Sequence, residues 1–156
     1  LAASMGYGYE KLTSIFFNEV KIKPENVFIL ACRDLDKGEI ELINKLKMNV
    51  WTTEQINKEG TSKVINGLLT LIKEKNIKNI HLSYDIDCLD PDYVPGTGTP
   101  VNDGLTYSQS KELLEAILGT NLVKSMDFVE YNPMLDKNNK TKETCFELLN
   151  LISDNL

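Results

Sequence analysis

Histidine and arginine are almost absent from this sequence. Its 156 residues include one of each, His81 and Arg33, and acidic residues outnumber basic ones to give a net charge of -6. A single histidine excludes any site that needs several imidazoles from this chain alone. The negative charge argues against non-specific binding to nucleic acid phosphates. We interpret the scarcity of arginine as a compositional bias toward Lys and Asn.

Paired cysteines and long apolar runs are also lacking. The three cysteines, Cys32, Cys88 and Cys145, are widely spaced and form no Cys-x-x-Cys pair. This pattern excludes a disulfide scaffold or zinc finger and favours free thiols in a reducing compartment, so we expect a cytoplasmic protein. No apolar run approaches the ~20 residues that cross a bilayer, and no signal peptide is visible. The first residue is not Met, so we expect the chain to be cut from something longer.

What is present predicts a globular domain of the α/β class. Hydrophobic residues make up 42% and charged residues 26%, which is an ordinary balance for one domain. Helical and strand patterns alternate, which favours a mainly parallel sheet. We expect the first helix to bury Leu12, Ile15 and Phe16, and the last to turn Cys145, Phe146, Leu149 and Ile152 inward. The expected helices are 8–19, 36–47, 61–75, one opened by Thr106, and 141–153, and the expected strands are 27–31, 50–52, 80–84 and 123–130.

Two carboxylates follow the strand expected at 80–84. Asp85 and Asp87 are two residues apart, which on an extended strand places them on one side, ~6.6 Å apart. Neighbouring carboxylates repel unless one is protonated or a cation lies between them, and oxygen ligands suit Mg, Ca or Mn. The alternative is that both aspartates merely cap a loop or a helix. We expect His81, on the same strand, to be a packed core residue and not a ligand.

A longer motif surrounds this pair. Residues 81–91 read His-Leu-Ser-Tyr-Asp-Ile-Asp-Cys-Leu-Asp-Pro, and an irregular stretch to Leu105 contains Pro-Gly-Thr-Gly-Thr-Pro and then Gly-Leu-Thr. The string resembles the signature of the arginase, or ureohydrolase, family. It departs from that signature at Asp103, where glycine is usual, and at Cys88, which we expect to be an inert buried thiol.

The resemblance implies a metal-dependent hydrolase. Asp85 would bridge two manganese ions, and Asp87 would bind one of them. Water held between two such cations loses a proton near neutral pH, and the resulting hydroxide attacks the guanidinium carbon. The implied substrate is L-arginine, which is cleaved to ornithine and urea.

Two further segments resemble the family and imply substrate contacts. Residues 126–133 match a strand ending in Glu-x-Asn-Pro, where Glu130 would pair with the substrate guanidinium. Thr99 matches a threonine beside the same pocket. Residues 33–39 resemble a segment of arginases in particular, in which Asp36 and Glu39 lie near the α-amino end of arginine, a group that agmatine lacks. The alternatives are a strand-end surface acid for Glu130, a turn residue for Thr99, and a capping box for Asp36 with Glu39.

The resemblance covers residues 1–156, but only as the C-terminal part of a single arginase-like domain. It implies a three-layer α/β/α fold, here incomplete, and a homo-oligomer, a trimer or hexamer. The family's Gly-Gly-Asp-His, Asp-Ala-His-x-Asp and Asn-x-His-Gly motifs are absent, so two of about six metal ligands remain. We therefore expect this chain alone to be inactive, to retain little manganese, and to self-associate through an uncovered sheet edge. Agmatinase, formiminoglutamase or a non-catalytic assembly module are the alternatives.

Overall fold

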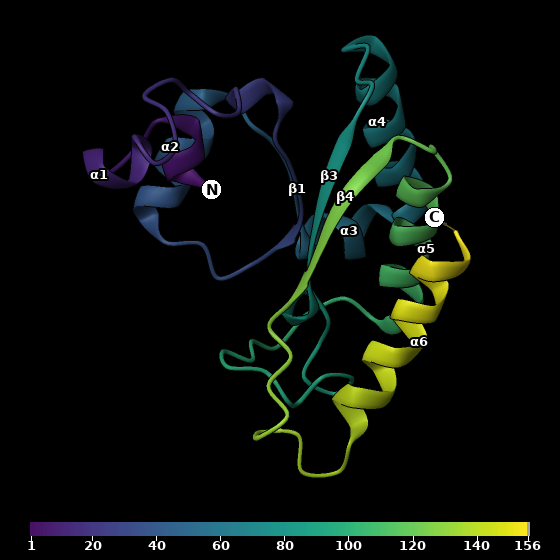
Figure 1. Cartoon of the computed structure of the whole chain (residues 1–156). Helices are drawn as coiled ribbons and strands as arrows, with labels where there is room; N and C mark the ends of the chain where they lie inside the picture. Colours follow the sequence, from purple (N-terminus) through teal and green to yellow (C-terminus); the bar gives the residue numbers. More distant parts are fainter. Residues whose placement is uncertain (156) are drawn as a thin grey trace.

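The computed structural model describes residues 1–155 and has the alternating α/β order that the sequence predicts (Figure 1). The strands are parallel within each pair, and the longer helices cover one face of them. No helix among the described residues is long and apolar enough to cross a bilayer. The helices are α1 Glu10–Thr13, α2 Lys37–Leu46, α3 Thr53–Glu59, α4 Thr61–Glu74, α5 Tyr107–Leu118 and α6 Lys140–Asp154, and the strands are β1 Phe28–Cys32, β2 Asn49–Thr52, β3 Ile80–Asp85 and β4 Val123–Val129.

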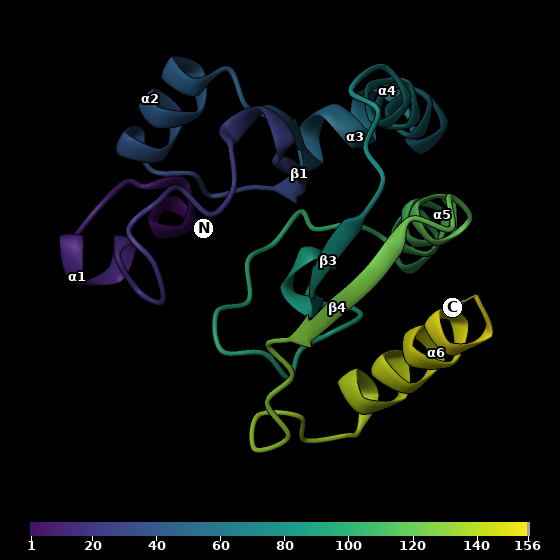
Figure 2. The same cartoon turned by 45° about the horizontal axis from the view of Figure 1, so that its top comes forward.

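The four strands form two separate ladders in the described chain. β1 pairs with β2, and β3 pairs with β4, both in parallel. Figure 2 shows β1 standing apart from the β3–β4 pair, with α4, α5 and α6 on one side of the strands. The incomplete parallel α/β fold expected from the sequence is therefore confirmed, although no backbone pairing in residues 1–155 joins the two ladders.

Shared helices hold the two ladders together. Leu68 and Ile72 of α4 and Ile117 of α5 form a buried cluster. Apolar residues from all four strands pack against this cluster, including Leu30 of β1 and Leu82 of β3. A second cluster lies between β3, the loop that follows it, and the helices α5 and α6, with Leu114 and Leu148 at its centre. The core thus supports the carboxyl end of β3, where the predicted site lies.

Capping explains where three of the helices begin. Asp36 with Glu39 forms the expected capping box at α2, and Thr106 with Gln109 forms one at α5. Each pair satisfies two backbone N–H groups that the helix itself leaves without acceptors. A third box, Thr52 with Gln55, starts α3, a helix that the sequence analysis did not predict.

The first predicted helix is largely wrong. Only Glu10–Thr13 is helical, and the chain then bends, with Phe16 at φ 70 and 97% exposed. Leu12 and Ile15 are also exposed, so within residues 1–155 the apolar face has nothing to pack against. Most helical stability in proteins comes from packing such a face, which explains why the segment does not continue as a helix.

The last helix has its buried face rotated from the prediction. Cys145 and Ile152 are buried as expected, but Phe146 and Leu149 are exposed. Leu148 faces the core instead and is completely buried. The buried positions are therefore spaced by three, four and seven residues, which is one stripe of an amphipathic helix.

Candidate metal and substrate site

The two predicted metal ligands meet at a turn, not along a strand. β3 ends at Asp85, and Ile86–Cys88 form one turn of 3-10 helix. The backbone N–H of Asp87 donates to Oδ1 of Asp85 over 2.8 Å. Asp85 therefore does cap a turn, as the alternative interpretation holds, and the turn brings Asp87 back beside it. The strand-spacing argument for the pair is wrong, but the two carboxylates are neighbours.

Asp87 has one satisfied and one unsatisfied carboxylate oxygen. The hydroxyl of Thr99 donates to Oδ2 of Asp87 over 3.1 Å, which joins two of the predicted site residues. Oδ1 of Asp87 is buried and has no hydrogen-bond donor among the described residues. A buried anionic oxygen without a partner is costly and rare. The unpaired atom is the feature that a cation at this position would satisfy.

Glu130 follows directly after β4, at the same edge. Asp85 lies opposite Val129 in the parallel register, so Glu130 comes one residue beyond that pair. Its backbone has φ 73, a conformation that side-chain-bearing residues rarely adopt. Oε2 of Glu130 lies 4.0 Å from the position that a Cβ atom on Gly98 would take, so the Thr-Gly-Thr turn is its neighbour. Strained backbone of this kind concentrates at functional sites.

The pKa of Asp85 is raised above its ordinary value. Desolvation by the surrounding chain is the largest cause, and the negative charges of Asp87 and Glu130 add to it. The backbone N–H of Asp87 and the positive charge of Arg33 act in the opposite direction. The negative charges of three carboxylates thus act on one another at this edge. Such an arrangement is relieved by a cation or by a cationic substrate.

The ligand set within the described chain is incomplete. No group of three or more His, Cys, Asp or Glu side chains in residues 1–155 comes together closely enough to hold a metal ion. Asp85 and Asp87 fit a hard divalent cation by the chemistry of their oxygens. Two carboxylates fall short of the six or so oxygen ligands that such an ion takes.

The two predicted contacts for the α-amino end lie at the start of α2. Asp36 and Glu39 bind each other's backbone N–H groups in the capping box of α2. Figures 1 and 2 show α2 beside α1, away from the carboxyl ends of β3 and β4. Among the described residues, no hydrogen bond links either acid to Asp85, Asp87 or Glu130.

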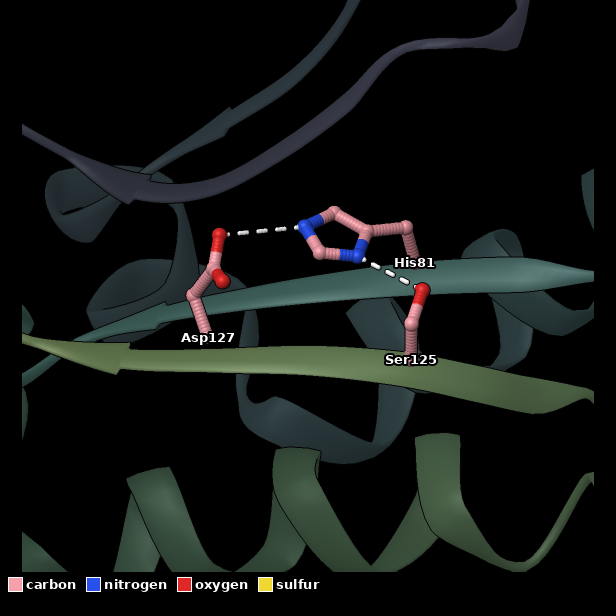
Figure 3. Close-up of polar contacts among 3 residues, drawn as sticks. All are labelled: His81, Ser125 and Asp127. Carbon is pink, nitrogen blue, oxygen red and sulfur yellow. Dashed lines mark hydrogen bonds and ion pairs between the residues drawn. The ribbon is translucent and has the colours of Figure 1, made fainter.

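His81 is not the packed core residue that the sequence analysis predicts. It lies on the open face of the β3–β4 pair with its side chain 53% exposed (Figure 3). Its Nδ1 lies 2.8 Å from the hydroxyl of Ser125, and its Nε2 lies 3.1 Å from Oδ2 of Asp127. The prediction that His81 is not a site ligand stays untested.

The loop between Asp87 and Leu105 is held in place by contacts within the loop and with the segments that follow β4. Leu89 and Leu105 form an isolated parallel bridge and are almost completely buried. The backbone N–H of Gly96 donates to the hydroxyl of Thr141 over 2.7 Å, and the N–H of Asn132 donates to the Gly96 carbonyl over 2.9 Å. The turn that carries Thr99 is thus fixed to the start of α6 and to the segment after Glu130.

The sequence analysis missed one residue that holds this loop in place. Arg33, interpreted as a sign of compositional bias, donates hydrogen bonds to the loop from the end of β1. A signal was present in the sequence, because Arg33 opens the segment 33–39 that resembles arginases. Arg33 also lines an open hollow on the surface, and none of the six predicted site residues belongs to the lining of this hollow.

Comparison with known proteins supplies the family. Residues 7–152 match the model of the Arginase family. The chain is 42% identical to the arginase of Brevibacillus brevis over 152 residues, which is 97% of this chain and 51% of that protein. It is 42% identical to the arginase of Bacillus subtilis over 149 residues, 96% of this chain and 50% of that protein.

Solved structures give the same result. The native arginase of Bacillus caldovelox superposes with a TM-score of 0.90 at 38% identity, over 97% of this chain and 50% of that one. The agmatinase-like protein of Burkholderia thailandensis gives a TM-score of 0.68 at 26% identity, over 85% of this chain and 40% of that one. The chain spans about half the length of the curated relatives it matches. With its fold, its motifs and these similarities in agreement, the chain belongs to the arginase family.

Proposed function

We propose that this chain forms the C-terminal part of an arginase, which hydrolyses L-arginine to L-ornithine and urea with two manganese ions. The observation that carries the proposal is the group of acids at the ends of β3 and β4, with the buried, unpaired Oδ1 of Asp87 at its centre. The higher TM-scores with arginases than with the agmatinase-like protein favour arginine as substrate over agmatine.

Asp85 and Asp87 would hold the metal. Each would offer carboxylate oxygens to it, Asp87 through the unpaired Oδ1. Manganese, when bound, would supply a water that loses its proton near neutral pH and serves as the nucleophile. Thr99 donates to the other oxygen of Asp87 and so fixes the direction in which Oδ1 points.

Glu130 would bind the reacting end of the substrate. A carboxylate accepts two parallel hydrogen bonds from a guanidinium group, which fixes both the distance and the plane of the substrate. Repulsion from the nearby acids makes this region favourable for a cation. Holding the guanidinium carbon in place is the part of catalysis that this residue can perform.

Asp36 and Glu39 would bind the α-amino end of arginine. Oδ1 of Asp36 and Oε2 of Glu39 accept the backbone N–H groups of the capping box. The second oxygen of each carboxylate accepts no hydrogen bond among the described residues and could accept one from an ammonium group. A related structure, the arginase of Entamoeba histolytica in complex with L-ornithine, is 29% identical, with a TM-score of 0.88. Ornithine carries the same α-amino head as arginine.

The second candidate is a non-catalytic assembly module. The incomplete ligand set and the exposed apolar residues around Phe16 favour it, because both need another polypeptide to complete them. A homo-oligomer, a trimer or hexamer in the cytoplasm, is proposed for either candidate. The two candidate functions differ in whether the gene also encodes an N-terminal half that carries the histidine and aspartate ligands.

Reading the gene upstream of Leu1 and assaying its complete product tests the proposal. We expect the missing ligand motifs in frame, and urea release from arginine that depends on added manganese. The matched variants are Asp87→Asn, which we expect to abolish turnover, and Asp92→Asn, on the same loop, which we expect to leave it unchanged. Asp36→Ala should impair arginine more than agmatine. Full activity after Asp85 and Asp87 are both changed to Asn would refute the metal-site assignment. Urea release by the 156-residue chain alone would refute the proposal that this part is inactive by itself.

A further inference from the structure

Arg33 owes its direction to an irregularity in β1. The register of β1 against β2 shifts between Leu30 and Cys32, and Ala31 between them has φ 61. This is a bulge, which bends a strand and redirects the side chains that follow. The carbonyl of Ala31 accepts a hydrogen bond from the hydroxyl of Thr53 over 3.0 Å. The bulge is therefore a supported feature, and Arg33 leaves it toward the loop after β3.

The guanidinium of Arg33 binds only backbone carbonyls of that loop. Its Nη2 donates to the carbonyls of Asp87 and Val101, each over 2.7 Å, and to that of Leu89 over 3.3 Å. Its Nε donates to the Val101 carbonyl over 3.2 Å, and its Nη1 reaches the Cys88 carbonyl at 3.5 Å. Among the described residues Arg33 forms no salt bridge with a carboxylate.

These carbonyls belong to both limbs of the loop. One limb contains Asp87, and the other contains Val101, two residues after Thr99. Because Thr99 donates to Asp87, the arginine closes a ring of contacts around the two site residues. The base of the loop has other ties, since Leu105 exchanges backbone hydrogen bonds with Cys88 and Asp90 over 2.9 Å. The base should therefore persist without Arg33, whereas the part that carries the site would lose its support.

We propose that Arg33 is a positioning residue that holds Asp87 and Thr99 in the geometry needed to bind the cation and the substrate. The inference rests on the proposed function, because it concerns the same site. It assigns to the chain's one arginine a role outside the substrate pocket. Lysine cannot replace it fully, because an ammonium group lacks the planar fork with five donors that reaches both limbs at once.

The test compares Arg33→Met and Arg33→Lys with a matched control, Lys124→Met. Lys124 also donates to a backbone carbonyl, that of Asn121 over 3.1 Å, but lies away from the loop. In the complete gene product, manganese affinity is measured by titration of the free Mn²⁺ electron paramagnetic resonance signal. We expect Arg33→Met to weaken it about 10-fold or more, as loss of an outer contact to a ligand does. Arg33→Lys should recover part of the loss, and Lys124→Met should stay within about twofold of wild type.

Hydrogen exchange of the 156-residue chain provides a readout that does not depend on manganese. In Arg33→Met, amides of residues 87–101 should exchange faster, while those of β3 and β4 keep their wild-type rates. If the loop amides of Arg33→Met exchange at the wild-type rate, the inference is overturned. Unchanged manganese affinity in Arg33→Met would overturn it as well. Global loss of protection in Arg33→Met and Arg33→Lys alike would also overturn it, because the arginine would then hold the fold and not the site. If the wild-type product binds no manganese, the proposed function fails, and the exchange data still decide whether Arg33 positions the loop.

Discussion

Gly104 lies against the backbone of the site loop at a point where no side chain fits. A Cβ atom on this residue would lie 2.4 Å from the backbone N of Asp90 and from the backbone C of Leu89. Non-bonded heavy atoms rest about 3.5 Å apart, so one segment of backbone must move by about 1 Å. Gly104→Ala therefore cannot be relieved by the rotation of a side chain.

The cost of Gly104→Ala can be worked from the contacts that this movement disturbs. The backbone N–H of Asp90 donates to Leu105 over 2.9 Å, and that of Gly104 donates to the Asp90 carboxylate over 3.1 Å. Weakening two hydrogen bonds costs about 1 kcal/mol each, and overpacking a well-filled site costs about 1–3 kcal/mol more. We expect the free energy of unfolding to fall by about 3–5 kcal/mol.

Gly67→Ala is the control. Gly67 lies inside α4, and the nearest atom to an added Cβ would be Cζ2 of Trp51 at 3.8 Å, an ordinary contact. Alanine in a helix interior is favoured over glycine by about 1 kcal/mol, so this variant should be more stable than wild type. Urea unfolding, followed by the fluorescence of the single tryptophan and by circular dichroism, measures both. A midpoint for Gly104→Ala at or above that of wild type would refute the steric reasoning.

Four further outcomes are expected of the 156-residue chain without metal. The raised pKa of Asp85 means that its ionised form destabilises the fold above that pKa, so Asp85→Asn should raise stability at pH 7, and the difference should vanish as the pH falls toward 3.8. Backbone N–H donors, first that of residue 92, lower the pKa of Asp90. Asp90→Asn should therefore reduce stability at pH 7, and this loss should disappear below pH 3.8. Changes in stability of the same sign for Asp85→Asn and Asp90→Asn would contradict the reasoning. Burial raises the pKa of Cys88 and Cys145 to about 11, so a disulfide reagent at pH 8 should modify them far more slowly in the folded chain than in urea. Sedimentation should show self-association through the uncovered strand edges, and a monomer at every concentration would contradict it.

Local signals in the sequence predicted much of this fold. The capping box of Asp36 and Glu39 and that of Thr106 and Gln109 mark the starts of α2 and α5 at the expected places. The box that starts at Thr52 has the same spacing, but α3 is only seven residues long and offers too short an apolar pattern to predict a helix.

Signals that depend on distant contacts were the ones that failed. The helix expected over 8–19 has the right periodicity, but Phe16 and its neighbours have no surface to cover in the described chain. The bulge at Ala31 has no local signature either, since alanine rarely adopts φ 61. Asp103 also has a positive φ, 62, which explains why glycine is usual at this position of the family signature.

The predicted site is partly assembled in the structure. Asp85, Asp87, Thr99 and Glu130 gather at one edge, as motif resemblance leads one to expect. Spacing along a strand does not explain their meeting, because the chain turns at Ile86–Cys88. The positions of Asp36 and Glu39 at the start of α2 were predictable from capping.

The separate strand ladders have a consequence for how the molecule opens. β1–β2 and β3–β4 share no backbone hydrogen bonds in the described chain. Each ladder can therefore unfold locally, and lose the protection of its amides from hydrogen exchange, as an independent unit. α4 and α5, which pack against both, act as a common brace through side chains such as Leu68 and Ile117. Shortening these side chains should therefore uncouple the opening of one ladder from that of the other before it unfolds either.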